Sequence, residues 1–337
     1  MKPPVAITVG DYNGIGPEVS LKAVASPRVR DLCTPVLVGP AEVFERTASR
    51  LSLRLRFRPF SSSPGPSGHA LAILEPGGAM PVRISPGRLS AHAGAAAGAA
   101  IRASVGLVLS GEARALVTAP VSKQALHLAG IHAPGQTELL QRLTGAPHVA
   151  MMLVSGTLRI GLVTIHTPLR RVSRELTAAL LRERITVIHR ALRTDWGIRS
   201  PRMAVLALNP HAGEGGDCGD EEQRVIIPVI ASLRDRPMRL EGPFPADAFF
   251  ARYGPGSFDA VVAMYHDQGL IPLKMSARGK AVNVSVGLPI VRTSPDHGTA
   301  FDIAGRSLAD PSSMIEAIRT AVAIASRRRV GARKGAP

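Results

Sequence analysis

Short apolar runs of strand length alternate with helical patterns along most of the chain, and this alternation constrains the fold more than any other feature. Val5–Val9, Pro35–Val38, Ala115–Val117 and Asp259–Met264 are such runs. Strands that alternate with helices are typical of an α/β fold built on a largely parallel sheet. Open sheets of this kind place their chemistry at the carboxyl ends of the strands, so the residues after these runs are the first functional candidates.

Three such strand ends carry a histidine. His166 follows an apolar hairpin, His211 follows the run Met203–Leu208, and His266 follows Asp259–Met264. Neighbouring strands would bring the three imidazoles together, and three histidines with an open position suit a catalytic divalent metal such as Zn²⁺. Asp247 or Asp267 could complete or orient the set. A structural role for one of the three histidines is the alternative, because they lack the short spacing of strong zinc motifs.

Cationic and polar residues later in the chain suit an anionic substrate. Lys274, Asn283 and Arg292 could converge on a phosphate, since arginine grips phosphate with two donors and lysine acts as a point charge. Each could instead be a surface residue. Thr118–Lys123 and Gly135–Glu138 are loops that enter helices, with side chains suited to anion or hydroxyl contacts.

The glycine-rich stretch Gly10–Glu18 lies between a strand and a helix, where Gly allows a tight turn and Pro17 suits a first helical turn. It does not match G-x-G-x-x-G, so no conventional dinucleotide fingerprint is present. The alanine- and glycine-rich segment Ser90–Ser110 predicts a helix whose small residues allow close packing against the sheet or a partner subunit.

Composition narrows the class of protein. With 337 residues, 45% of them apolar, the chain is long enough for two domains with sizeable cores. No apolar run reaches the roughly eighteen residues of a membrane span, and Met1–Pro4 shows no signal-peptide pattern, so we expect a cytoplasmic protein without a membrane partner. Cys33 and Cys218, the two cysteines, are expected to be reduced thiols.

The net charge of +16 raises the question of nucleic-acid binding. Arginines are scattered along the chain, however, and only 12 aromatic residues are available for stacking. The one dense cluster, Arg327–Arg329 with Arg333 and Lys334, falls in an expected tail. We therefore expect no nucleic-acid partner, and the basicity would attract anionic substrates.

Four stretches resemble the 4-hydroxythreonine-4-phosphate dehydrogenase family of pyridoxal phosphate biosynthesis. They are Gly10-Asp11 with Gly14–Glu18, Leu208–Gly216, Met264–Gly269, and Arg292–Ser294 with Asp296–Ala300. They stand in the family's order, and the resemblance extends from about Val5 to Ala325. Gly14–Glu18 and His297–Gly305 are also similar to the isocitrate and isopropylmalate dehydrogenase superfamily.

The resemblance implies a homodimer of subunits that each contain two α/β/α domains, with the active site in the interdomain cleft and completed by the neighbouring subunit. The first domain would comprise 1–130 and 286–330 and carry the nucleotide-binding loop. The second, 131–285, would carry the metal and substrate residues and the dimer contacts. A basic tail, 331–337, would follow.

The resemblance also implies roles for individual residues. The implied metal ligands are His166, His211 and His266, with Asp247 as a further candidate. The implied substrate-binding residues are Gln136, Thr137, Lys274, Asn283 and Arg292. The implied cofactor-binding residues, against the adenosine part of NAD, are His297, Gly298, Thr299, Asp302 and Gly305. Lys274, Asp267 and a metal-bound water are the candidate proton acceptors.

The implied reaction is the NAD-dependent oxidation of 4-phosphooxy-L-threonine to 2-amino-3-oxo-4-phosphooxybutanoate, which loses CO₂ to give 3-amino-2-oxopropyl phosphate. Zn²⁺ is the expected metal, with Mg²⁺ or Co²⁺ as alternatives, and NADP is the alternative cofactor. The metal would act as a Lewis acid on the oxygen that is oxidised.

Two positions depart from the family's usual sequence. Gln136 stands where the family usually has histidine, and Tyr12-Asn13 stands where it usually has Pro-Ala. Glutamine cannot carry a charge, which leaves the substrate open. A sister dehydrogenase acting on a phosphorylated sugar acid (4-phospho-D-threonate or erythronate), or on a dicarboxylate dihydrodiol, is the alternative. A basic nucleic-acid-binding protein on the same fold is the alternative from another class.

Overall fold

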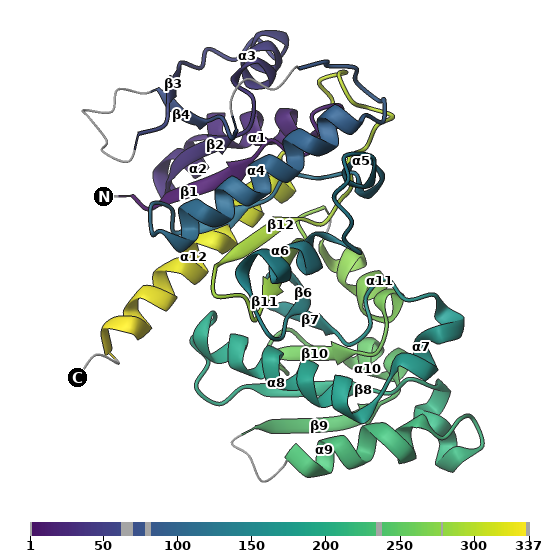
Figure 1. Ribbon diagram of the computed structural model, residues 1–337. Helices are drawn as coiled ribbons and strands as arrows, with labels where there is room; N and C mark the ends of the chain where they lie inside the picture. The colour runs from purple at the N-terminus through teal and green to yellow at the C-terminus, as the bar shows by residue number, and fades with distance from the viewer. Residues whose placement is uncertain (1, 62–69, 78–81, 234–237, 278, 335–337) are drawn as a thin grey trace. The chain divides into compact units, whose positions relative to one another are not determined.

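The chain folds into two compact α/β units, which confirms the predicted fold class. The computed structural model describes residues 2–61, 70–77, 82–233, 238–277 and 279–334, with the backbone alone for 329–334 (Figure 1). Unit 1 contains Met1–Gly145 and Leu288–Ser326, and unit 2 contains Ala146–Gly287 and Arg327–Pro337.

The first unit ends at Gly145, whereas the sequence placed the boundary at residue 130. The difference arises because α6 (Gln136–Thr144) packs on α4 (Ala91–Leu109) of unit 1. Of the expected tail 331–337, the part up to Lys334 continues the last helix, α12 (Ser312–Lys334), and residues 335–337 lie outside the described range.

Unit 1 is built on a sheet in which every described strand pair is parallel, in the order β3-β4-β2-β1-β5-β12. β1, at its centre, is almost wholly buried, since both of its faces are covered by helices. The strands are β1 (Pro4–Thr8), β2 (Thr34–Val38), β3 (Phe57–Pro59), β4 (Leu71–Leu74), β5 (Ala115–Val117) and β12 (Arg292–Pro295). The other helices are α1 (Gly16–Ala25), α2 (Pro27–Leu32), α3 (Ala41–Arg50) and α5 (Lys123–Leu128).

Helix α4 shows why its sequence is rich in small residues. A Cβ atom added at Gly94 would lie 1.9 Å from the carbonyl oxygen of Ala125, and one at Gly98 would lie 2.2 Å from the Ile131 side chain. Glycine is therefore required for α4 to approach α5 and the segment after it. This is the one described helix long and apolar enough to span a membrane, but 56% of that span is buried inside the protein, which identifies it as a core helix.

Unit 2 contains a mixed sheet in the order β11-β6-β7-β10-β8-β9. β6 and β7 form the predicted hairpin, β6 is also antiparallel to β11, and β7, β10, β8 and β9 run parallel. The strands are β6 (Ala150–Ser155), β7 (Leu158–Leu162), β8 (Arg202–Leu206), β9 (Arg239–Phe244), β10 (Ala260–Ala263) and β11 (Val282–Val286). The helices are α7 (Leu169–Glu175), α8 (Ala178–Thr194), η1 (Pro210–Gly216), η2 (Glu222–Ile226), α9 (Ile227–Leu233), α10 (Ala246–Arg252) and α11 (His266–Ala277).

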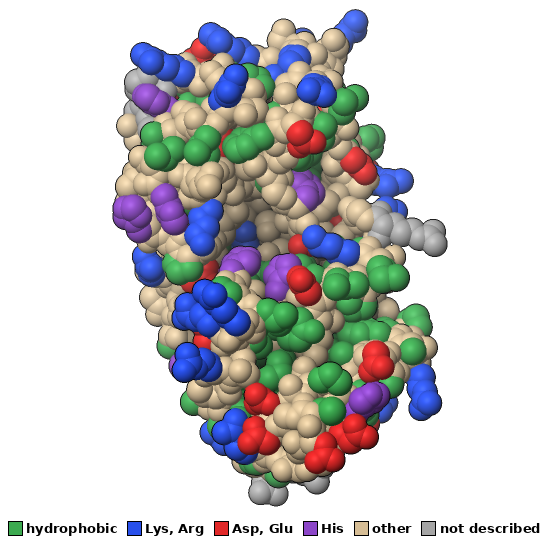
Figure 2. Space-filling model, turned by 90° about the vertical axis from the view of Figure 1, so that its right-hand side faces the viewer, with side chains coloured by type: hydrophobic (Ala, Val, Ile, Leu, Met, Phe, Trp, Pro, Cys, Tyr) green, Lys and Arg blue, Asp and Glu red, His purple; other side chains and the backbone are tan. Residues whose placement is uncertain are grey.

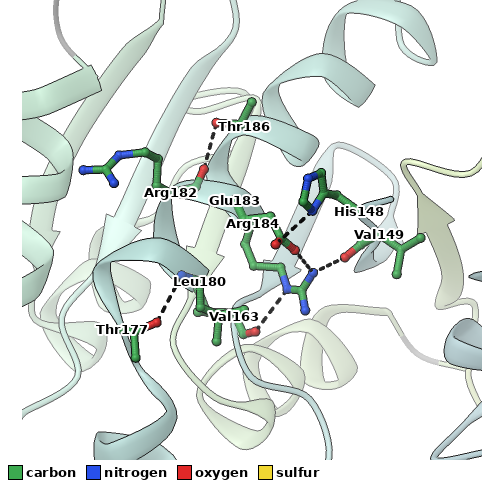
Figure 3. A network of polar contacts seen from close by, with 9 residues as sticks. All are labelled: His148, Val149, Val163, Thr177, Leu180, Arg182, Glu183, Arg184 and Thr186. Carbon is green, nitrogen blue, oxygen red and sulfur yellow. Dashed lines mark hydrogen bonds and ion pairs between the residues drawn. The ribbon is translucent and has the colours of Figure 1, made fainter. Parts of the chain in front are cut away.

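A polar network fixes α8 to the sheet of unit 2 (Figure 3). Thr177 caps the helix by accepting a hydrogen bond from Leu180 N at 3.2 Å. The Arg184 guanidinium donates to the carbonyl oxygens of Val149 and Val163, while Glu183 pairs with both Arg184 and His148. These contacts anchor the helix beside the strand ends, and His148 takes part in them through its ion pair with Glu183.

The basic residues form no single nucleic-acid-binding stripe on the face shown in Figure 2, where Lys and Arg side chains are spread among acidic, polar and apolar ones. Part of the one dense arginine cluster is used inside unit 2. Arg328 donates twice to Asp195, at 2.7 and 2.9 Å, and the Asp195 side chain is only 1% exposed. This arginine therefore serves the fold. Both cysteines are free thiols.

Candidate active-site residues

His166 and His266 are brought together by two neighbouring parallel strands. β7 and β10 pair in register, Leu162 opposite Ala263, and the chain continues from each strand towards a histidine. Thr164 links the segments that follow these two strands, since its hydroxyl donates to Met264 O at 2.7 Å. The two imidazole rings lie 6.0 Å apart between centroids and are tilted by 38°. Two of the three predicted metal ligands thus share one edge of unit 2.

Asp267 orients the second of these histidines. Its carboxylate lies 2.7 Å from His266 Nδ1, which favours a proton on that nitrogen and the lone pair on Nε2. Gln268 braces the turn, because its side chain accepts from Met264 N at 2.7 Å and donates to Ala207 O at 2.6 Å. The bracing role of Gln268 escaped the sequence analysis, since it depends on β8 and β10 being neighbours.

His211 lies on an unusual turn. Residues 211–215 all have positive φ angles, between 43° and 80°, although three of them are not glycine. The buried Glu222 carboxylate holds the turn by accepting from Leu208 N, Asn209 N and Asn209 Nδ2 at 2.7 to 2.9 Å. His211 itself is exposed.

Within one chain the described residues contain no group of three or more His, Cys, Asp or Glu side chains that could hold a metal ion. A single copy therefore offers His166 and His266 as neighbours, and the trio with His211 stays a prediction. Asp247, the further candidate ligand, is exposed in the first turn of α10, because the chain becomes helical directly after Pro245.

The other predicted substrate residues of unit 2 lie on α11 and β11. Lys274 is exposed on α11, in the same helix that begins at His266. Asn283 is half-buried on β11, where its Nδ2 lies 3.5 Å from Met151 Sδ. Its Oδ1 is buried and has no hydrogen-bond partner among the described residues. An orphaned buried amide oxygen is a natural acceptor for a ligand donor.

In unit 1, Arg292 is the centre of a second group of predicted substrate residues. It is 2% exposed, and its guanidinium donates to Thr118 Oγ1 at 2.6 and 3.1 Å and to Gln136 Oε1 at 3.0 Å. Burial lowers the pKa of Arg292 to about 10, an effect that the Glu138 carboxylate opposes, so the group is charged at neutral pH. Thr137 follows as a buried residue in the first turn of α6.

Thr118 is a functional candidate that the sequence indicated only as part of the loop Thr118–Lys123. It directly follows β5, and the parallel pairing of β5 with β12 sets it beside Arg292. Two strands separated by more than 170 residues meet here, and no local pattern announces that pairing. The oxygens of Thr118 and Gln136 that accept from Arg292 are neutral, and the Glu138 carboxylate also acts on the Arg292 charge.

The segment His297–Gly305 follows β12 in the same unit. His297, Gly298 and Asp302 are exposed, and a Cβ atom added at Gly298 would meet no atom within 4 Å. The backbone at Gly298 is therefore open, next to the exposed imidazole of His297.

Comparison with known proteins identifies the family. The family profile of the pyridoxal phosphate biosynthetic protein PdxA matches residues 31–321. The chain belongs to the PdxA family. It is thus a dehydrogenase of the PdxA family, for which NAD or NADP is the implied hydride acceptor.

Individual PdxA-family proteins are similar over nearly the whole chain. A 4-hydroxythreonine-4-phosphate dehydrogenase from Trichlorobacter lovleyi is 42% identical over 97% of this chain and 99% of its own length. A D-threonate 4-phosphate dehydrogenase from Cupriavidus necator is 43% identical over 97% and 98%. The crystal structure of a 4-hydroxythreonine-4-phosphate dehydrogenase from Klebsiella pneumoniae has a TM-score of 0.86, with 39% identity over 96% of this chain and 98% of that one.

Proposed function

We propose that this PdxA-family dehydrogenase oxidises 4-phosphooxy-L-threonine with NAD. The observation that carries the proposal is the buried Arg292 guanidinium, held by Thr118 and Gln136, whose charge calls for an anionic group on the substrate. Phosphate matches the fixed geometry of a guanidinium better than it matches a mobile lysine. The relative from T. lovleyi, 42% identical, carries this activity in its name.

The proposed reaction has two steps, hydride transfer and decarboxylation. The hydride on C3 passes to the nicotinamide, the C3 hydroxyl loses its proton, and the product is a ketone β to the carboxylate. Cleavage of the C1–C2 bond then releases CO₂, and its electron pair is taken up by the ketone before C2 is protonated. Lys274 is the proposed proton-transfer group, and Asp267 serves by orienting His266.

The residues present fit a divalent metal, since His266 is already oriented by a carboxylate and His166 lies beside it. His166 and His266 would hold it together with His211 of the partner subunit. Histidine ligands suit Zn²⁺. When bound, the metal would act as a Lewis acid that polarises the substrate oxygen. Because the third histidine would come from the partner subunit, we propose a homodimer. Asn283 and Thr137 are proposed as further substrate contacts, and Asp247 is proposed to lie near the metal.

The cofactor is proposed to bind along His297, Gly298, Thr299, Asp302 and Gly305. The exposed Asp302 carboxylate would accept from a ribose hydroxyl, a contact that favours NAD over its 2′-phosphorylated form. Binding of NADH and NADPH to the purified protein, compared by fluorescence titration, tests this preference directly. Tighter binding of NADPH would contradict it.

The second candidate substrate is 4-phospho-D-threonate, which the similarity to a second relative favours. The D-threonate 4-phosphate dehydrogenase from C. necator is 43% identical, as similar as the first relative. The two substrates share the phosphate and differ at C2, which carries an amino group in one and a hydroxyl in the other. Metal-dependent NADH formation with each substrate side by side decides between them. Turnover of 4-phospho-D-threonate alone would overturn the first proposal, and turnover of neither would overturn both.

A further inference from the structure

Asn13 connects the glycine-rich loop of unit 1 to a second loop that is distant in sequence. The residue is fully buried and follows Asp11 in a tight turn, in which Gly14 N donates to Asp11 O at 3.0 Å. The Asp11 carboxylate accepts from Asn13 N, also at 3.0 Å. This turn fixes the backbone of Asn13, so the direction of its side chain is set by the loop itself.

The Asn13 side chain uses both ends of its amide on segment 85–88. Its Oδ1 accepts from Ser85 N at 2.8 Å and its Nδ2 donates to Arg88 O at 2.9 Å. The Asn13 carbonyl accepts a third bond, from Gly87 N at 2.8 Å. Segment 85–88 lies outside the described helices and strands, so these bonds are a large part of what defines its shape.

Segment 85–88 in turn backs the loop His297–Gly305. A Cβ atom added at Gly87 would lie 2.9 Å from Phe301 O, and one at Gly305 would lie 2.9 Å from the Pro86 side chain. The glycine-rich loop also contacts this loop, since Ile15 N donates to Thr299 O at 2.9 Å. The loop His297–Gly305 therefore packs against two segments that Asn13 ties together.

We propose that Asn13 is a positioning residue for dinucleotide binding, which acts by holding segment 85–88 against the loop His297–Gly305. The inference rests on the proposed function, which places the dinucleotide at that loop. Without the Asn13 amide, segment 85–88 loses two hydrogen bonds and the loop loses its backing. We expect the effect on cofactor affinity, because the side-chain hydrogen bonds of Asn13 among the described residues go to segment 85–88.

The test compares Asn13→Ala and Asn13→Asp with wild type. Asn13→Asp keeps an acceptor for Ser85 N and loses the donor to Arg88 O, so it should show an intermediate effect. Ser104→Ala is the matched control, since it removes a buried hydroxyl bonded to Ala100 O at 2.7 Å in the core helix of the same unit. NADH affinity is measured by fluorescence titration without substrate, and hydrogen exchange reports the amides of Ser85 and Gly87.

Asn13→Ala should weaken NADH binding and raise the KM for NAD by about tenfold, a loss of about 1.4 kcal/mol. The KM for the phosphorylated substrate and kcat at saturating NAD should change by less than about twofold. Ser104→Ala should lower the melting temperature without changing NADH affinity. Faster exchange at Ser85 and Gly87 with unchanged NADH affinity would overturn the inference alone. A wild-type protein that binds no dinucleotide would overturn the proposed function with it.

Discussion

Gln136 places a neutral side chain next to a buried cation. Its Oε1 accepts from Arg292 at 3.0 Å, which turns the amide nitrogen into a donor for whatever binds beside it. A protonated histidine could not accept that bond and would repel the guanidinium. The positive charge beside Gln136 is that of Arg292, and it does not depend on pH in the neutral range.

Replacing Gln136 by histidine should make substrate binding depend on pH. An imidazole titrates near pH 6.5, lowered further by the neighbouring Arg292, so the charged form adds attraction for phosphate only in acid. We expect the ratio of the variant's KM to the wild-type KM to rise severalfold between about pH 5.5 and 7.5. Taking the ratio at each pH cancels the titration of the substrate phosphate.

Gln136→Glu is the matched control for that experiment, because its carboxylate has nearly the same shape and would pair with Arg292. We expect at least about tenfold weaker binding of the phosphorylated substrate. A ratio for Gln136→His that stays constant with pH, or a Gln136→Glu variant with normal KM, would show that Gln136 does not face the substrate.

Asp11 should make stability depend on pH. Burial raises the pKa of its carboxyl from 3.8 to about 6, although the hydrogen bond from Asn13 N opposes the change. The native state therefore favours the protonated form. Its stabilising contribution is complete below about pH 3.8 and is lost as the pH rises through about 6, because the unfolded chain releases this proton more easily.

The variant Asp11→Asn cannot ionise and keeps an acceptor for Asn13 N, so it should gain stability relative to wild type as the pH rises from about 4 to 7. The difference in unfolding free energy should reach on the order of 3 kcal/mol. Urea unfolding at several pH values measures it. Asp31→Asn is the control, since the Asp31 side chain is 80% exposed. Parallel curves for wild type and Asp11→Asn would contradict the prediction.

At the scale of elements, the close approach of α4 to α5 depends on one glycine. A Cβ atom at Gly94 would lie 1.9 Å from Ala125 O, a backbone atom that cannot move aside alone. Gly106 lies in the same helix, and a Cβ atom there would meet nothing within 4 Å. Gly94→Ala should destabilise the protein by about 1–3 kcal/mol through overpacking. Gly106→Ala should stabilise it by about 0.5–1 kcal/mol through helix propensity.

The melting temperatures of Gly94→Ala and Gly106→Ala, measured by thermal unfolding, check these two predictions, and each variant is the control for the other. Equal melting temperatures would mean that α4 and α5 separate freely. The sequence already indicated this helix, because Ser90–Ser110 is rich in alanine and glycine, but it left open whether the helix packs against the sheet or against a partner subunit.

Local patterns predicted most of the elements, and tertiary context decided the rest. The hairpin of β6 and β7 and the strand β10 follow from their apolar runs. The boundary at Gly145 depends on α6 packing against α4, which no local pattern shows. The left-handed turn at His211 is held by Glu222 from eleven residues later, so its shape is equally invisible in the local sequence.

The same limit applies to the candidate site. The end of each strand could be read from the sequence, so His166 and His266 were identified correctly as residues at neighbouring strand ends. The order of the strands in the sheet could not be read from the sequence. For that reason the hydrogen bond between Thr118 and Arg292 was missed, and so was the bond from Gln268 to Ala207 O, just after β8. The number of chains that contribute to the metal site is a property of the whole molecule.

At the scale of the whole molecule, the proposed metal site is incomplete within one chain. His166 and His266 are neighbours, and among the described residues no third side chain of a suitable type joins them. We propose that the third ligand comes from the second copy of the chain. In a symmetric dimer this happens at both sites, so each site would combine His166 and His266 of one copy with His211 of the partner subunit. Light scattering should accordingly show a dimer, and removing the metal with a chelator should abolish turnover.

Mixing two inactive variants tests this exchange. His211→Ala and His266→Ala should each lose activity and metal content alone. After unfolding and refolding together, half of the dimers are mixed, and each mixed dimer contains one site with all three histidines. Activity should return to about a quarter of the wild-type value. If all three histidines served the same chain, every site in the mixture would lack one ligand, and no activity would return. A mixture of His166→Ala with His266→Ala, both removed from the same half of the site, should stay inactive in either case.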